Sequence, residues 1–218
     1  MSDAIKHECG LAYIRLRKPF SYYLQKYGTA TYGLSKMYLL MEKQHNRGQD
    51  GAGVAAVKLN VEAGYPFMHR MRSNAPQPIA DIFFKIGEEV KELEKYQKDI
   101  TTFPGLFKGH LPMLGELLLG HLRYGTQGKN NVEFCHPFVK RDIQPGRNLA
   151  LAGNFNLVNT DELYDLLKRE LRWEMPAARL GHESGDGEWQ SLYDAFHRSL
   201  LAGVPRQFGL WDVQEKIY

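Results

Sequence analysis

The chain has 218 residues, of which 43% are hydrophobic and 24% charged, proportions that are typical of a folded globular protein and exclude wholesale disorder. Its formal net charge of +3 is too small to indicate a nucleic acid as partner, and no apolar run reaches the roughly 18 to 20 residues that cross a membrane. No secretory signal precedes Cys9, and Cys9 and Cys135 alone cannot form a disulfide framework, so we expect a cytoplasmic protein.

The first part of the chain predicts alternating strands and helices. Residues 9–17 mix β-branched and aromatic residues with partial alternation, which predicts a strand. Apolar residues recur at helical spacing in residues 30–45, which predicts an amphipathic helix. Residues 52–59 are small and apolar, as in a buried strand whose backbone is approached closely. Residues 65–72 alternate in the manner expected of its hairpin partner.

The next part of the chain opens with a long helical pattern. Residues 77–99 place apolar residues at helical spacing between Lys and Glu, which predicts a partly exposed helix of the kind found in a solvated insertion. Residues 117–124 predict a buried strand that carries Arg123 at its end, and residues 148–153 predict another short buried strand. A threonine N-cap indicates a helix over residues 160–167.

The composition changes after residue 168. All three tryptophans lie beyond this point, and the strand-rich pattern does not continue. We therefore expect residues 169–218 to be a divergent tail rather than a continuation of the preceding domain.

Four segments pair a reactive or polar group with glycines, which let a backbone approach a ligand closely. An arginine at a strand end offers a fixed fork for a carboxylate. An asparagine beside a free backbone N–H can stabilise an oxyanion. The four segments are residues 7–10 (His-Glu-Cys-Gly), 45–53 (His-Asn-Arg-Gly-Gln-Asp-Gly-Ala-Gly), 120–128 (Gly-His-Leu-Arg-Tyr-Gly-Thr-Gln-Gly) and 153–159 (Gly-Asn-Phe-Asn-Leu-Val-Asn).

In this order, the four segments resemble the class II glutamine amidotransferases, which are N-terminal-nucleophile (Ntn) hydrolases, and among them the amidophosphoribosyltransferase family of purine biosynthesis. The resemblance covers residues 9 to about 165. It implies an α+β fold, the four-layer αββα sandwich of two antiparallel sheets stacked between helices. It also implies a glutamine amidotransferase domain over residues 9–168, with a helical insertion at 77–99.

The resemblance makes Cys9 the nucleophile, which in this family is the first residue of the mature chain. Residues 1–8 would then be a leader that is removed at the Glu8–Cys9 bond. A free α-amine titrates at about 7.7 to 8.0 and can take the proton of a thiol whose reference pKa is near 8.5. While residues 1–8 are attached, the Cys9 nitrogen is an amide and cannot act as this base.

The resemblance also assigns the groups that stabilise the reaction. The side-chain amide of Asn154 and the backbone N–H of Phe155 would form the oxyanion hole. The family usually has glycine at the position of Phe155. The thiolate of Cys9 would attack the side-chain amide of glutamine, ammonia would leave with a proton from the α-amine, and water would hydrolyse the thioester to glutamate.

Further residues are assigned to substrate binding in the same way. Arg123 would hold the α-carboxylate of glutamine. Arg47 and Asp50 match a segment that lies beside the nucleophile and shapes the site. Asp186 lies in an Asp-x-Glu string, which fits the family's binding group for the substrate amine. No cofactor is expected.

We expect no metal site. His110, His121 and His136 are scattered and lack the spacing of metal ligands. We interpret Cys135–His136 as structural, because adjacent side chains on a strand point to opposite faces.

The sequence also predicts an incomplete protein. The full enzymes of the family carry a phosphoribosyltransferase domain, marked by a strand that ends in paired acidic residues, and this pattern does not occur here. About six candidate strands are roughly half of what two full sheets need. A truncated sandwich would leave strand edges and an apolar face exposed, so we expect the isolated chain to be poorly stable or inactive.

Three interpretations stay open. The leading one is the glutaminase half of a glycosyltransferase that supplies ammonia to phosphoribosyl pyrophosphate, with the acceptor domain absent from this chain. A second is another class II amidotransferase, serving glucosamine-6-phosphate or glutamate synthesis. A third is an inactive fragment or pseudo-enzyme with a structural or regulatory role. The sequence is compatible with a homo-oligomer but does not fix the oligomeric state.

Overall fold

The computed structural model describes residues 8–62, 64–93, 108–125, 131–141 and 148–154, together with Glu162 and Asp165. Contacts divide the chain into two units, Met1–Phe155 and Asn156–Tyr218. Every helix and strand named below belongs to the first unit. In the second unit, Glu162 and Asp165 are helical, while the rest of the helix predicted at 160–167 and the tail at 169–218 lie outside the described residues.

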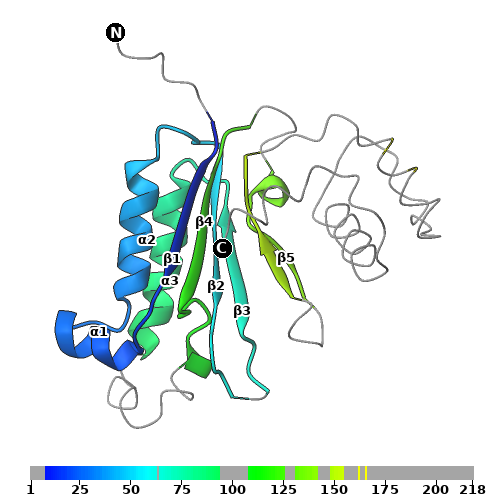
Figure 1. Ribbon diagram of the computed structural model, residues 1–218. Helices are drawn as coiled ribbons and strands as arrows, with labels where there is room; N and C mark the ends of the chain where they lie inside the picture. The colour runs from blue at the N-terminus through cyan, green and yellow to red at the C-terminus, as the bar shows by residue number, and fades with distance from the viewer. Residues whose placement is uncertain are drawn as a thin grey trace. The chain divides into compact units, whose positions relative to one another are not determined.

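Four antiparallel strands form the main sheet of the first unit (Figure 1). Their order in the sheet is β1-β4-β2-β3, so β4 lies between the two earliest strands of the chain. Residues of both faces are buried toward the end of β4, which explains why this strand reads as a nearly continuous apolar run. The strands are β1 (Gly10–Arg15), β2 (Gly51–Val57), β3 (Met68–Ser73) and β4 (Leu117–Arg123).

The structure confirms the four strands predicted at residues 9–17, 52–59, 65–72 and 117–124. It also confirms that β2 and β3 pair as antiparallel neighbours, with Val54 opposite Met71.

Helices α1, α2 and α3 belong to the same unit as this sheet, and α2 and α3 pack on one of its faces. They are α1 (Phe20–Tyr27), α2 (Tyr32–Lys43) and α3 (Pro78–Leu93). Helix α2 contacts β1 and β4 and confirms the helix predicted at 30–45, whereas α1, which was not predicted, packs beside α2. None of the described helices is both long enough and apolar enough to cross a membrane.

The main core lies between these helices and the sheet. Alternate residues of β2 and β4 point toward the helices, as the two-residue period of a strand requires. Each large aliphatic side chain buried in this way stabilises the fold by about 1.5 to 3 kcal/mol. The largest fully buried side chains of this core are Met37, Met41, Val54, Ile82, Met113, Leu118 and Leu122.

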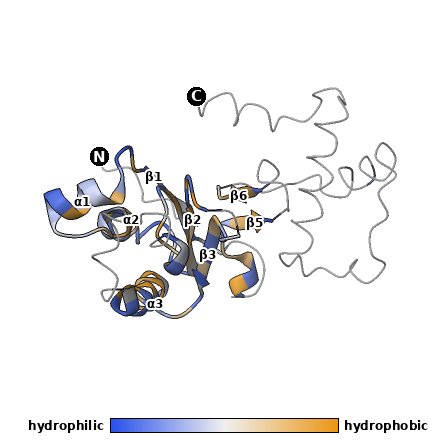
Figure 2. Cartoon of the chain, turned by 90° about the horizontal axis from the view of Figure 1, so that it is seen from below, coloured by the Kyte–Doolittle hydropathy of each residue, from blue (hydrophilic) through white to orange (hydrophobic). Residues whose placement is uncertain are grey.

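Helix α3 differs from the solvated insertion that the sequence indicated. Its residues Ile79, Ile82 and Ile86 are buried in the main core, and the helix contacts β2 and β3. Figure 2 shows its hydrophobic residues gathered along one side. Charged residues occupy its outer face, which is why the sequence predicted a solvated helix. The described part of the predicted 77–99 helix is therefore a core element.

A second, two-stranded antiparallel sheet lies on the other face of the main sheet (Figure 2). It consists of β5 (Phe138–Lys140) and β6 (Leu149–Leu151). Strand β6 confirms the strand predicted at 148–153, but its residues are half-buried rather than buried; β5 was not predicted. The described part of the chain is thus α+β, with two antiparallel sheets.

A buried ion pair closes the end of the main sheet that is remote from Cys9. Lys108 pairs with Glu116, and the second carboxylate oxygen of Glu116 accepts the N–H of Leu59 at 2.8 Å. Lys58 donates from its Nζ atom to the Lys108 carbonyl. Burial lowers the pKa of Lys58 to about 8, against the opposing attraction of Glu116 and Glu89. These contacts fasten the segment before β4 to the end of β2.

Candidate active site

Cys9 lies directly before β1, at one end of the main sheet. Gly10 is paired with Leu122 of β4, so Cys9 is level with the end of that strand. The backbone N–H of Tyr124 donates to the Cys9 sulfur at 3.4 Å, and the sulfur lies 3.9 Å from the Tyr124 carbonyl oxygen. The side chain is half-buried. The antiparallel pairing of β1 with β4 therefore fixes the thiol at the end of the main sheet where β1 begins and β4 ends.

The segment before β2 packs against the same end of β4. The N–H of Asp50 donates to the carbonyl of Arg123 at 3.0 Å, and its Oδ2 accepts the N–H of Gly125 at 2.7 Å. Gly48 allows this approach, because a Cβ atom there would lie 2.6 Å from the backbone carbon of Arg123. Asp50 thus holds the chain as it leaves β4.

Arg123 is the last residue of β4 and is only 5% exposed. Its guanidinium carbon lies 5.6 Å from the ring centre of Phe134. Leu122 points toward the helices, so Arg123 points to the opposite face, where the second sheet lies. A planar, permanently charged guanidinium in such a place is suited to holding a carboxylate in a fixed orientation.

Arg47 takes part in an ion pair with Glu8, the residue before Cys9. The Arg47 Nη2 atom lies 3.0 Å from a carboxylate oxygen of Glu8, and the two side chains are 49% and 44% exposed. An exposed pair of this kind contributes at most about 1 kcal/mol. It nevertheless places the guanidinium of Arg47 beside the side chain of the residue that precedes Cys9.

Asn154 is exposed and follows Gly153, whose backbone is bonded to two histidines. Nε2 of His121 lies 3.2 Å from the Gly153 carbonyl oxygen, and the Gly153 N–H donates to Nδ1 of His136 at 3.3 Å. The two imidazole rings are 4.4 Å apart. His121 and His136, which are scattered in the sequence, therefore lie together in the structure. The placing of His136 on a strand is wrong, since it lies in a bend before β5.

His121 is 1% exposed and stays neutral. Burial, together with the nearby His136 and Arg123, lowers its pKa to about 3, although the hydrogen bond to the Gly153 carbonyl opposes this shift. Because a carbonyl oxygen only accepts, the ring proton must be on Nε2. Nδ1 is buried and, within the part of the chain that the structure describes, has no hydrogen-bond partner. The sequence signal for the contact between His121 and Gly153 was the position of this histidine, two residues before Arg123 and therefore on the same face of the strand.

The structure therefore brings together Cys9, Arg47, Asp50 and Arg123 at one end of the main sheet. It connects Asn154 to β4 through Gly153 and His121. Phe155 and Asp186 lie outside the described residues. Among the described residues, no group of three or more His, Cys, Asp or Glu side chains is placed to hold a metal ion.

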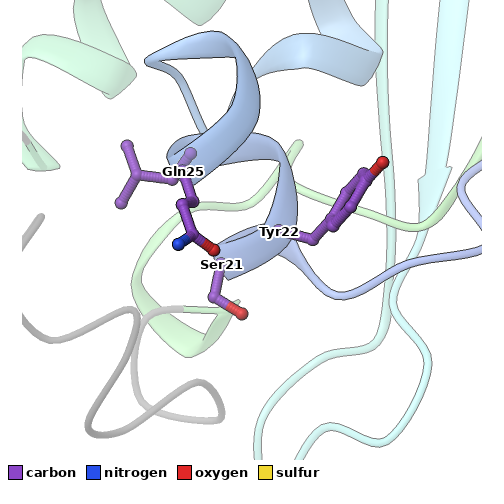
Figure 3. Close-up of a pocket in the computed structure, with 4 residues that line it drawn as sticks. Ser21, Tyr22 and Gln25 are labelled. Carbon is purple, nitrogen blue, oxygen red and sulfur yellow. The ribbon is translucent and has the colours of Figure 1, made fainter.

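A shallow hollow on the outside of α1 is separate from these residues (Figure 3). Ser21, Tyr22, Leu24 and Gln25 line it. Helix α1 follows the end of β1 that is opposite Cys9, so the hollow holds none of the predicted site residues.

The chain is similar to two curated enzymes with the same name. It is 40% identical over 78 residues to the amidophosphoribosyltransferase of Methanocaldococcus jannaschii, a match that covers 35% of this chain and 15% of the relative. It is 34% identical over 113 residues to the amidophosphoribosyltransferase of Mycobacterium leprae, which covers 51% of this chain and 18% of that relative. The chain thus spans less than a fifth of either relative. No protein-family model matches it.

Proposed function

We propose that this chain is the glutamine-hydrolysing part of an amidophosphoribosyltransferase-like enzyme of the cytoplasm. The observation that carries the proposal is the position of the Cys9 thiol, held by the backbone of Tyr124 directly beyond the buried Arg123. A nucleophile and a carboxylate-binding group are what hydrolysis of glutamine requires at one place. The similarity to two amidophosphoribosyltransferases supports the same activity.

The proposed reaction uses the groups named above. With residues 1–8 removed, the α-amine of Cys9 takes the thiol proton, and the thiolate attacks the side-chain amide of a glutamine held by Arg123. The Asn154 amide and the Phe155 N–H stabilise the oxyanion. Ammonia leaves with a proton from the α-amine, and water hydrolyses the glutamyl thioester. The ammonia is destined for phosphoribosyl pyrophosphate.

We also propose that residues 9–168 build a four-layer αββα domain in which the two described sheets are stacked. The support is the packing of helices α2 and α3 on one face of the main sheet, with β5 and β6 on the other. Leu11 and Tyr13 are 50% and 59% exposed on β1, at positions that alternate with the buried Gly10 and Ala12. Additional strands beside β5 and β6 would cover them.

The test starts from the amino terminus of the protein. We expect the intact mass of the active form to correspond to a chain that begins at Cys9, and we expect that form to release glutamate and ammonia from glutamine in equal amounts. Cys9→Ala should abolish turnover. Cys135→Ala is the matched control. Cys135 is buried and has no part in the proposed reaction, so this variant should keep turnover near wild type.

A glutamine-like electrophile provides the second measurement. It should label the wild-type protein and Cys135→Ala but not Cys9→Ala. If a chain that begins at Cys9 neither hydrolyses glutamine nor reacts with the electrophile, the proposed function is wrong and the interpretation as an inactive fragment replaces it.

A further inference from the structure

We propose that His121 and His136 form a clamp on Gly153 that positions Asn154 for oxyanion stabilisation. This inference rests on the proposed function, because it gives the two histidines a role through the oxyanion residue. They act on the backbone before Asn154 and are therefore positioning residues.

The clamp uses both polar groups of one residue. The Gly153 carbonyl oxygen lies 3.2 Å from Nε2 of His121, and the Gly153 N–H donates to Nδ1 of His136 at 3.3 Å. Glycine has the greatest backbone freedom of any residue. Two hydrogen bonds, one on each side of its α-carbon, restrict this freedom directly before Asn154.

The two rings must be in complementary states. His121 has to donate from Nε2, and His136 has to accept at Nδ1. Each bond therefore specifies one tautomer of its ring. The rings lie 4.4 Å apart, and His136 also lies 4.3 Å from the ring of Phe138 in β5. These contacts fix the ring planes, so the acceptor and the donor point at Gly153 rather than at solvent.

The backbone of both histidines is held in place by neighbouring strands. His121 is 1% exposed in the central strand β4. His136 lies across β2 at Gly53, where a Cβ atom would overlap the His136 carbonyl oxygen. Arg72 of β3 donates to the Cys135 carbonyl at 3.2 Å and holds the same segment. The clamp thus transmits the rigidity of the main sheet to the end of β6.

Rigidity at this point has a chemical purpose. An oxyanion donor works only when it is already placed where the charge develops, and removing one donor lowers turnover by about 100- to 1,000-fold. A misplacement of about 1 Å can cost about 100-fold. The exposed Asn154 has few packing contacts to set its position, so its backbone must set it.

The experiment compares variants that keep or remove each hydrogen bond in the processed protein. His136→Asn keeps an acceptor near the place of Nδ1, while His136→Phe keeps the ring contacts and removes the acceptor. His121→Gln keeps a donor near the place of Nε2, while His121→Phe removes it. We expect the Phe variants to lower kcat for glutamine hydrolysis by about 10- to 100-fold with KM changed less than about twofold. The Asn and Gln variants should restore most of the activity.

A double-mutant cycle separates positioning from general damage. Because the clamp acts through Asn154, His136→Phe should cost little further activity once Asn154→Ala is present. An equal loss of kcat with and without the Asn154 side chain would overturn the inference.

Amide hydrogen exchange at Gly153 tests the clamp without using activity. Exchange should be faster in His136→Phe and close to wild type in His136→Asn, and unchanged exchange in His136→Phe would overturn the clamp. If the wild-type protein has no glutaminase activity but Gly153 exchange responds in this way, the clamp stands as a structural device and the proposed function fails.

Discussion

Cys9, Asp50 and Arg123 reach the candidate site mainly through backbone contacts. The sulfur of Cys9 meets the N–H of Tyr124, and Asp50 bonds the backbone on both sides of that residue. The partners in these bonds are backbone groups whose places follow from strand register, so the side chains of Cys9 and Asp50 have little freedom. At the scale of single residues, the backbone of the segment that follows β4 therefore holds the sulfur of Cys9 and the carboxylate of Asp50.

The buried His121 makes stability depend on pH. Its pKa is about 3 in the folded protein and about 6.5 when the chain unfolds. Between these values the unfolded chain binds a proton that the folded chain does not. The free energy of unfolding should therefore fall by up to about 1.4 kcal/mol for each pH unit below about 6.5.

Urea denaturation of the wild-type protein and His121→Gln at about pH 7 and about pH 5 measures this effect. The variant should lose less stability between the two pH values, because its side chain does not titrate. Equal losses in both proteins would show that other groups cause the acid dependence.

At the scale of secondary-structure elements, glycine marks where segments approach each other closely. Gly48, Gly51 and Gly53 lie in or beside β2, and a Cβ atom at any of them would collide with a neighbouring segment. Gly87 in α3 is different, because a Cβ atom there would meet nothing within 4 Å. Substitution by alanine should therefore have opposite effects on the free energy of unfolding at the two kinds of glycine.

We expect Gly48→Ala to lower the free energy of unfolding by about 1 to 3 kcal/mol, because the added methyl group meets the backbone of Arg123. We expect Gly87→Ala to raise it by about 0.5 to 1 kcal/mol, because alanine favours a helix more than glycine does. Chemical denaturation of both variants checks this pair. A stabilised Gly48→Ala variant would contradict the close approach of residues 47–51 to β4.

At the scale of the whole molecule, the main sheet has an exposed edge at β1. This strand pairs only with β4 among the described strands, and Leu11 and Tyr13 on it are 50% and 59% exposed. An exposed edge that carries large apolar side chains is a template for association with another chain.

The double substitution Leu11→Thr with Tyr13→Thr should therefore reduce self-association of the chain at high concentration. Threonine keeps the preference for a strand while removing apolar surface. Sedimentation velocity measures the change in apparent mass, and labelling of Cys9 by a thiol reagent controls for an intact site. If the wild type is already a monomer at every concentration, the β1 edge has no such role.

Much of this architecture could be predicted from local patterns. The two-residue period in residues 9–17 and 65–72 and the helical spacing in 30–45 each report on one element alone, and each prediction was confirmed. Helix α1 has only eight residues, so it gives too few helical periods to recognise. The sequence predicted a solvated helix at α3 because of its many charged residues, whereas Ile82 is buried in the main core.

The sequence by itself determined which residues are proposed as the reactive groups: a cysteine followed by a strand, an arginine at a strand end and an asparagine after a short strand. Only the tertiary structure decided which of them meet, because the sheet order β1-β4-β2-β3 brings Cys9 to Tyr124 across 115 positions of the chain. The pairing of His121 with His136 has the same origin. Local periodicity records which face of an element is apolar, but contacts between distant segments follow from strand order and from the close approach that glycines permit.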